Sequence, residues 1–181
     1  PEGEKRLEGY LFPDTYSFNI GESESIIVET MLKRFDREMA ELGFEALAEE
    51  NGISLHQAVT IASLVEREAK ADEERPLIAG VIYNRLNISM PLQIDATIQY
   101  ALGENKPEIY YKDLEVDSPY NTYRNYGLPP GPIAMPGRAS LLAAVNPADT
   151  DYLYYVAKPD GSHAFATTLA QHNVNKEMYQ Q

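Results

Sequence analysis

The sequence predicts an α+β fold that is mainly helical, with a small antiparallel sheet and a long loop rich in proline and tyrosine. Apolar residues recur at three- and four-residue spacing through much of the first half of the chain, which is typical of helices. Residues 118–137 contain five prolines and three glycines, so this segment cannot be helix or central strand over most of its length. Near the C-terminus, the aromatic run 152–157 (YLYYVA) favours a strand.

The helix predicted for residues 53–70 is central to this fold. Ser54 is a suitable N-cap, and the apolar residues that follow give the helix a broad buried face. At about 3.6 residues per turn, Glu68 falls one turn beyond Leu64, at the edge of this face, whereas Arg67 falls opposite it. A carboxyl group at that edge would be partly desolvated, which raises its pKa and suits it to act as a general acid. The same periodicity is also compatible with an acidic helix end that is exposed to solvent. Taken alone, it favours this second interpretation.

The segments around this helix are assigned by the same patterns. Residues 8–19 form an extended segment that turns at Pro13 and Asp14. Further helices are predicted for residues 22–42, 44–50 and 72–86. In the last of these, Pro76 lies in the first turn, where a missing amide is harmless.

The second half of the chain mixes short elements. Residues 90–101 begin with apolar–polar alternation and then wind into a short helix, and residues 138–145 form another. Two strands, 152–157 and 163–167, are joined by a turn at 159–161. A terminal helix covers 169–181.

Composition excludes several classes of function. The chain has 181 residues, 44% of them hydrophobic, which suits a single catalytic domain covering 1–181. The formal net charge of -13 argues against a nucleic-acid partner, because binding phosphates needs clustered Lys and Arg. There is no cysteine, and His56, His163 and His172 share no zinc-site spacing, so we expect no metal and no cofactor. No apolar run is long enough to span a membrane.

The remaining chemistry is that of carboxylates beside tyrosines and amides. A GxSxG nucleophile elbow is absent, and the glycines of the 118–137 loop alternate with prolines that cannot donate to phosphate. Sugars present flat apolar faces and many hydroxyls, which tyrosine and amide side chains bind well. One acid at the scissile bond suffices to protonate a glycosidic oxygen. For any single tyrosine, packing against a small core is the simpler interpretation.

Several short motifs occur in order along nearly the whole chain: YLFPDTY at 10–16, ASLVEREA at 62–69, YNRL at 83–86, MPLQIDATIQY at 90–100, YNTYRNYGLPPGPIAMPG at 120–137 and HAFATTLAQHN at 163–173. Together they resemble the YceG-like (MltG) family of endolytic murein transglycosylases. The resemblance implies a lysozyme-like catalytic core that cleaves the β-1,4 bond between N-acetylmuramic acid (MurNAc) and N-acetylglucosamine (GlcNAc). The product would carry a 1,6-anhydroMurNAc end, formed without water.

The resemblance also implies site residues. It places the catalytic glutamate in the Glu66-Arg67-Glu68 motif, and we match it to Glu68, with Glu66 holding the motif or a substrate group in place. Other lytic transglycosylases follow their acid with a small hydroxyl residue, whereas this chain has Ala69. The supporting residues, which either brace the cleft or contact substrate, are Gln93, Asp95 and Thr97. The candidates for substrate binding are Tyr120, Asn121, Thr122, Tyr123, His163 and Asn173, although a structural role is the default for His163 and Asn173.

Two alternative functions stay open. A muramidase-type hydrolase would use Asp95 as a second carboxylate, and a non-catalytic wall-binding module would grip glycan with the tyrosine-rich loop. The resemblance further implies peptidoglycan strands and the cell-wall synthesis machinery as partners. It implies a location on the outer face of the bacterial cytoplasmic membrane, through an N-terminal anchor and a LysM-like domain that this chain does not include.

Overall fold

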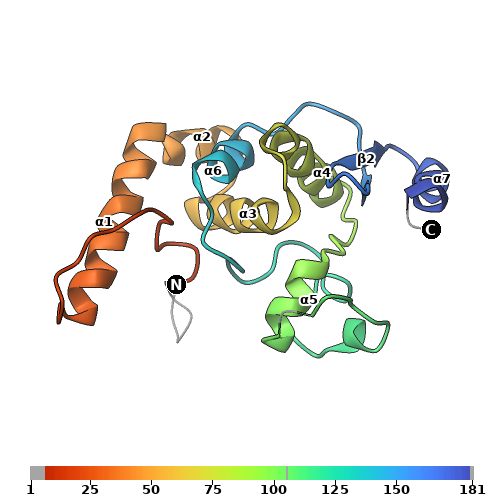
Figure 1. Cartoon of the computed structure of the whole chain (residues 1–181). Coiled ribbons are helices and arrows are strands. Elements are labelled where there is room, and N and C mark those ends of the chain that lie inside the picture. The colour runs from red at the N-terminus through yellow and green to blue at the C-terminus, as the bar shows by residue number, and fades with distance from the viewer. Residues whose placement is uncertain (1–6, 105, 180–181) are drawn as a thin grey trace.

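The computed structural model describes residues 7–104 and 106–179, and these residues form a group of helices with one two-stranded sheet at one end (Figure 1). The α-helices are α1 (Glu24–Leu42), α2 (Phe44–Glu50), α3 (Leu55–Glu68), α4 (Arg75–Asn87), α5 (Asp95–Leu102), α6 (Arg138–Val145) and α7 (Leu169–Tyr179). Two short 3-10 helices are η1 (Asp72–Glu74) and η2 (Asp113–Glu115), and the strands are β1 (Tyr154–Ala157) and β2 (His163–Ala166). The predicted α+β class is confirmed. Among the described residues, no helix has the length and apolar character needed to cross a bilayer.

Helix α3 is the centre of the hydrophobic core. Ser54 and Gln57 form a capping box at its start, with each side chain bonding to the main-chain amide of the other residue. Residues 58–65 are all buried, and α3 packs chiefly against α6 and α4. The helix ends at Glu68, and Ala69 is already extended. The predicted helix is therefore confirmed, two residues shorter at each end, and its last residue is the candidate acid.

The segment 72–86 departs from the prediction at its start. Instead of one helix, residues 72–74 form η1 and the regular α4 begins at Arg75. Pro76 lacks the amide that would bond to the carbonyl of Asp72, so the α-helical ladder cannot extend back through η1. Glu74, the last residue of η1, is buried and accepts a hydrogen bond from the amide of His163 at the start of β2.

The loop 118–137 contains neither helix nor strand, as predicted, yet it is held closely against α3. The amide of Ile133 donates to Ser63 Oγ over 3.0 Å. His56 Nε2 lies 2.9 Å from the carbonyl oxygen of Pro130. These contacts make the loop an ordered side of the molecule rather than a linker.

The sheet and α7 lie at the opposite end of the molecule from α1 (Figure 1). β1 and β2 are antiparallel, with Tyr155 opposite Phe165. Both strands are shorter than predicted. Helix α7 packs mainly on these two strands, and none of its residues is buried. The predicted terminal helix is present to Tyr179, and residues 180–181 lie outside the described residues.

Candidate active site

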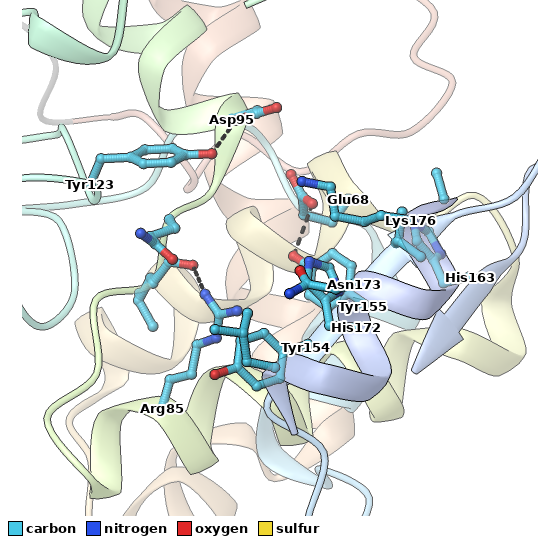
Figure 2. A pocket seen from close by; sticks show the side chains of 15 residues that line it. Glu68, Arg85, Asp95, Tyr123, Tyr154, Tyr155, His163, His172, Asn173 and Lys176 are labelled. Carbon is cyan, nitrogen blue, oxygen red and sulfur yellow. Dashed lines mark hydrogen bonds between the residues drawn. The ribbon is translucent and has the colours of Figure 1, made fainter. Parts of the chain in front are cut away.

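A pocket of about 540 Å³ opens beside the end of α3. It brings together segments far apart in the sequence, from α3, α4, the start of α5, the 118–137 loop, both strands and α7 (Figure 2). The predicted site residues that line it are Glu68, Gln93, Asp95, Tyr123, His163 and Asn173.

Glu68 is the most perturbed acid in this pocket. The residue is half-buried, but protein atoms crowd its carboxyl group, and this burial raises its pKa. The Tyr155 hydroxyl donates to Glu68 Oε2 over 2.9 Å and, with the charges of His163 and Arg67, lowers the pKa in part. The charge of Asp95 raises it further. The net effect favours the protonated acid, the property that the helical projection predicts for Glu68.

Glu66 lies outside the pocket. Its Oε2 accepts hydrogen bonds from the amide of Gly137 at 3.1 Å and from Ser140 Oγ at 2.6 Å. Arg75 Nη1 lies 3.4 Å from the same oxygen. Glu66 therefore ties the end of α3 to the start of α6 and to α4.

Asp95 and Tyr123 form a second polar pair in the pocket (Figure 2). The Tyr123 hydroxyl donates to Asp95 Oδ1 over 2.5 Å. Burial first, and this hydrogen bond second, raise the pKa of Tyr123, so its hydroxyl stays a donor. Gln93 precedes this pair with φ at 51°, a left-handed conformation that costs a non-glycine residue about 1 kcal/mol or more. Strain of this kind is often held at functional sites.

The other predicted loop residues support this pair from behind. Asn121 is fully buried, donates to the carbonyls of Leu114 and Val116 and accepts from the amide of Tyr123. Its three hydrogen bonds fix the main chain that carries Tyr123. Tyr120 packs its ring against Tyr100, with ring centroids 4.7 Å apart. Neither Tyr120 nor Asn121 lines the pocket.

Thr97 and Thr122 are buried side by side behind the start of α5. Their hydroxyl oxygens are 2.9 Å apart, and Thr122 Oγ1 accepts from the amide of Ile94 over 3.0 Å. Thr97 Oγ1 also donates to the Ile94 carbonyl. The two threonines thus join the 118–137 loop to the turn that presents Asp95, and they do not line the pocket.

His163 is held by Glu74, which also fixes the start of β2. His163 Nδ1 lies 2.7 Å from Glu74 Oε2, and the His163 amide donates to Glu74 Oε1 over 2.8 Å. The His163 ring meets the Tyr155 ring edge-on, with centroids 5.4 Å apart. Tyr155 therefore contacts both Glu68, through its hydroxyl, and the buried His163 that Glu74 holds in place. In the described part of the chain, no group of three acidic or histidine side chains is arranged to hold a metal ion.

Among the polar and aromatic residues that line the pocket, five were not predicted from the sequence: Arg85, Tyr154, Tyr155, His172 and Lys176. One signal was available for Arg85, because it falls at helical spacing from buried Val81 and Ile82, where an arginine needs an explanation. Tyr155 lies in a strand that was predicted, but nothing local indicates that it faces Glu68.

Comparisons with known proteins show the family to which the chain belongs. The YceG-like family model matches residues 2–178. The chain is 48% identical over 174 residues to the endolytic murein transglycosylase of Bacillus subtilis, covering 96% of this chain and 48% of that protein. It is 40% identical over 176 residues to the Streptococcus pneumoniae protein of the same name, covering 94% and 32%. The chain thus spans about half the length of the first relative and about a third of the second.

A solved structure gives the same result for the fold. The crystal structure of a YceG-like protein from Listeria monocytogenes matches with a TM-score of 0.87 at 46% identity, covering 93% of this chain and 55% of that one. The resemblance seen in the sequence motifs is confirmed, and this chain belongs to the YceG-like family.

Proposed function

We propose that this chain is the catalytic domain of a peptidoglycan lytic transglycosylase that cuts the β-1,4 bond between MurNAc and GlcNAc within glycan strands. The observation that carries the proposal is Glu68, an acid with a raised pKa that lines a pocket rich in tyrosine and amide groups. The names of the relatives from Bacillus subtilis and Streptococcus pneumoniae support the same reaction.

In the first step, protonated Glu68 gives its proton to the glycosidic oxygen as the bond from that oxygen to C1 of MurNAc breaks. The leaving strand departs with a hydroxyl, and positive charge develops on the muramyl ring. Asp95 lines the same pocket as a carboxylate and would stabilise this charge. Its hydrogen bond from Tyr123 holds it in place.

In the second step, the Glu68 carboxylate removes the proton from the C6 hydroxyl of the same sugar, whose oxygen then bonds to C1. The 1,6-anhydro ring closes, Glu68 is protonated again, and no water is consumed. One group thus serves as acid and then as base. Burial favours its protonated form, and the Tyr155 hydrogen bond favours the carboxylate, so opposing contacts support both roles.

A muramidase is the second candidate, and one observation favours it. Asp95 lies close enough to raise the pKa of Glu68 through its charge, as a second catalytic carboxylate would. Asp95 would then activate a water or attack C1, and the product would carry a hydrated reducing end. A module that only binds glycan has no need for an acid with a raised pKa.

The first prediction concerns Glu68→Gln. The variant keeps the shape of the side chain but has no proton to donate, so release of anhydro-muropeptides from purified glycan strands should fall at least about a thousandfold, roughly 4 kcal/mol in barrier. Mass spectrometry separates anhydro ends from hydrated ends, which are one water heavier. Hydrated ends as the main product of the unmodified protein would favour the muramidase instead.

Glu66→Gln is the matched control. Since Glu66 lies outside the pocket, the folded Glu66→Gln protein should retain turnover. If Glu68→Gln keeps full activity and Glu66→Gln loses it, the assignment of the catalytic acid to Glu68 is wrong.

Partners and location are proposed on the same basis. We expect the full-length protein to meet peptidoglycan and the wall-synthesis machinery on the outer face of the cytoplasmic membrane. Protease accessibility in intact protoplasts tests this location, and full protection of the domain would argue against it.

A further inference from the structure

Three basic side chains that line the pocket have no ion-pair partner among the described residues: Arg85 of α4, with His172 and Lys176 of α7. The chain has 28 acidic residues against 15 lysines and arginines, so carboxylates are in excess. Elsewhere in the molecule, arginines form ion pairs with these carboxylates, as Arg34, Arg75 and Arg138 do. Within residues 7–104 and 106–179, neither Arg85 nor Lys176 forms an ion pair. We call Arg85, His172 and Lys176 the basic cluster.

Arg85 is the best-anchored member of the basic cluster. Arg85 is only 9% exposed as a whole residue. Nε donates to the carbonyl of Leu153 and Nη1 to that of Leu92, each over 2.6 Å, and Nη1 also reaches Pro91 at 3.2 Å. No hydrogen bond joins Nη2 to the described residues. The guanidinium is therefore held rigidly by neutral carbonyls, with one nitrogen unused and no counter-charge, which is costly for a buried cation.

His172 connects the other two members. Its ring stacks on Tyr154 with centroids 5.2 Å apart, and its Nδ1 is buried without a hydrogen-bond partner among the described residues. Burial lowers the pKa of His172, and the charges of Lys176 and Arg85 lower it further. His172 thus lies close enough to both cations for their charges to act on it. A bound anion would offset these charges and accept hydrogen bonds from Arg85 and Lys176.

We propose that the basic cluster binds a carboxylate of the glycan strand while Glu68 acts on the glycosidic bond. The proposal rests on the proposed function, which makes peptidoglycan the substrate. Such strands offer two carboxylate sources: the lactyl group of a muramyl residue without a peptide, and the peptide stem of a substituted one. Arg85 supplies a fixed donor and Lys176 a mobile one, a pairing suited to a carboxylate at the edge of the pocket.

The test measures binding to the Glu68→Gln protein, so that ligands survive. Four soluble strands of equal length are titrated by calorimetry: free lactyl carboxylates, the same groups as methyl amides, intact stems, and stems with every carboxylate amidated. We expect one charged strand to bind more tightly than its amidated counterpart. The pair that shows the difference identifies the source as lactyl or stem.

Lys176→Met on the same background should weaken binding of that charged strand about twofold to fivefold, the effect of a partly exposed ion pair. Its affinity for the amidated strand should not change. Arg85 is left intact because it also holds three main-chain carbonyls. Lys33→Met is the control, since Lys33 is an exposed lysine of α1 that pairs only with Glu29 on the surface.

Two outcomes would overturn the proposal: equal affinity for charged and amidated strands in both pairs, or an equal loss for both strands in Lys176→Met. The proposed function fails separately. If the unmodified protein does not cut strands, or Glu68→Gln still does, the catalytic assignment is wrong whatever the binding data give. If cleavage depends on Glu68 but no carboxylate preference is found, the carboxylate proposal is wrong and the catalytic assignment stands.

Discussion

At the scale of single residues, Glu68 is controlled by two opposing contacts. Crowding by protein atoms disfavours its charge, whereas the Tyr155 hydroxyl stabilises it. The same burial raises the pKa of Tyr155 well above its usual range, so the hydroxyl remains a donor at any physiological pH. Ala69 provides no hydroxyl beside the acid, and Tyr155 supplies one from β1 instead.

Tyr155→Phe should therefore raise the pKa of Glu68 further and move the alkaline limb of the pH profile of kcat/KM to higher pH. It should also lower kcat at neutral pH by about tenfold, because the carboxylate formed in the first step loses a hydrogen bond of about 1.5 kcal/mol or more. Steady-state rates on defined strands between pH 4 and 9 (about the range of carboxyl and histidine titration) measure both effects.

Tyr152→Phe is the control for this substitution. Tyr152 precedes β1, and its ring packs against Phe165 instead of lining the pocket. We expect an unchanged profile for Tyr152→Phe. A Tyr155→Phe profile that overlays the parent's would show that the hydroxyl has no influence on the acid.

At the scale of elements, the pocket depends on a loop without regular structure. The 118–137 loop presents Tyr123, and buried Asn121 replaces the main-chain hydrogen bonds that a helix or strand would supply. Thr122 links the loop to the turn before α5. The position of Tyr123 is therefore set by Asn121 and Thr122, whose side chains do not line the pocket.

Asn121→Ala should destabilise the protein by about 2–4 kcal/mol, because two carbonyls and one amide lose their hydrogen bonds to a fully buried side chain. Urea unfolding measures the change. Asn125→Ala provides the comparison, since Asn125 is exposed and donates to the carbonyls of Ser118 and Asn121. We expect a loss of about 1 kcal/mol or less there. Equal losses in both variants would contradict the role given to Asn121.

Elements were predictable where local rules decide them. The bounds of α2 and α6 agree with the prediction, and α3 differs by two residues at each end, because caps, glycine stops and apolar spacing lie within the segment itself. Helical spacing predicted the place of Glu68 at the edge of the buried face, whereas its choice as the candidate acid came from the family resemblance. A supporting role was predicted for Thr97, but its partner Thr122 is distant in the sequence and was not foreseen. Asn121 was predicted to bind substrate, whereas its side chain is buried and bonds to the main chain of its own loop. Arg85 and Tyr155 were missed because their place in the pocket depends on how the strands pack on α4.

At the scale of the whole molecule, the raised pKa of Glu68 makes stability depend on pH. A carboxyl group with a raised pKa binds its proton more tightly in the folded than in the unfolded state. Stability therefore falls as pH rises from the unfolded pKa, about 4.3, towards the raised folded value. Below the unfolded pKa the penalty is absent.

Glu68→Gln removes this penalty, so the variant should melt at a higher temperature than the parent at pH 7. The difference should close as pH falls to about 4, where Glu68 is protonated in both states. Glu66→Gln should instead melt lower at pH 7, because it weakens contacts to Gly137, Ser140 and Arg75. Calorimetric melting at several pH values checks both signs. A gap for Glu68→Gln that does not vary with pH would rule out the titration as its cause.

Helix α7 has a consequence for how a polymer could enter. Under the proposed function the strand is cut internally, so it has to enter the pocket from the side and not by threading from one end. Helix α7 contributes Leu169, His172, Asn173 and Lys176 to the pocket, yet none of its residues is buried, and it packs mainly on a two-stranded sheet. Helix α7 forms a wall of the pocket without any buried residue to anchor it, so we expect it to detach before the core helices do. A lateral opening at α7 would admit the middle of a strand and release both cut ends without unfolding the acid's own helix.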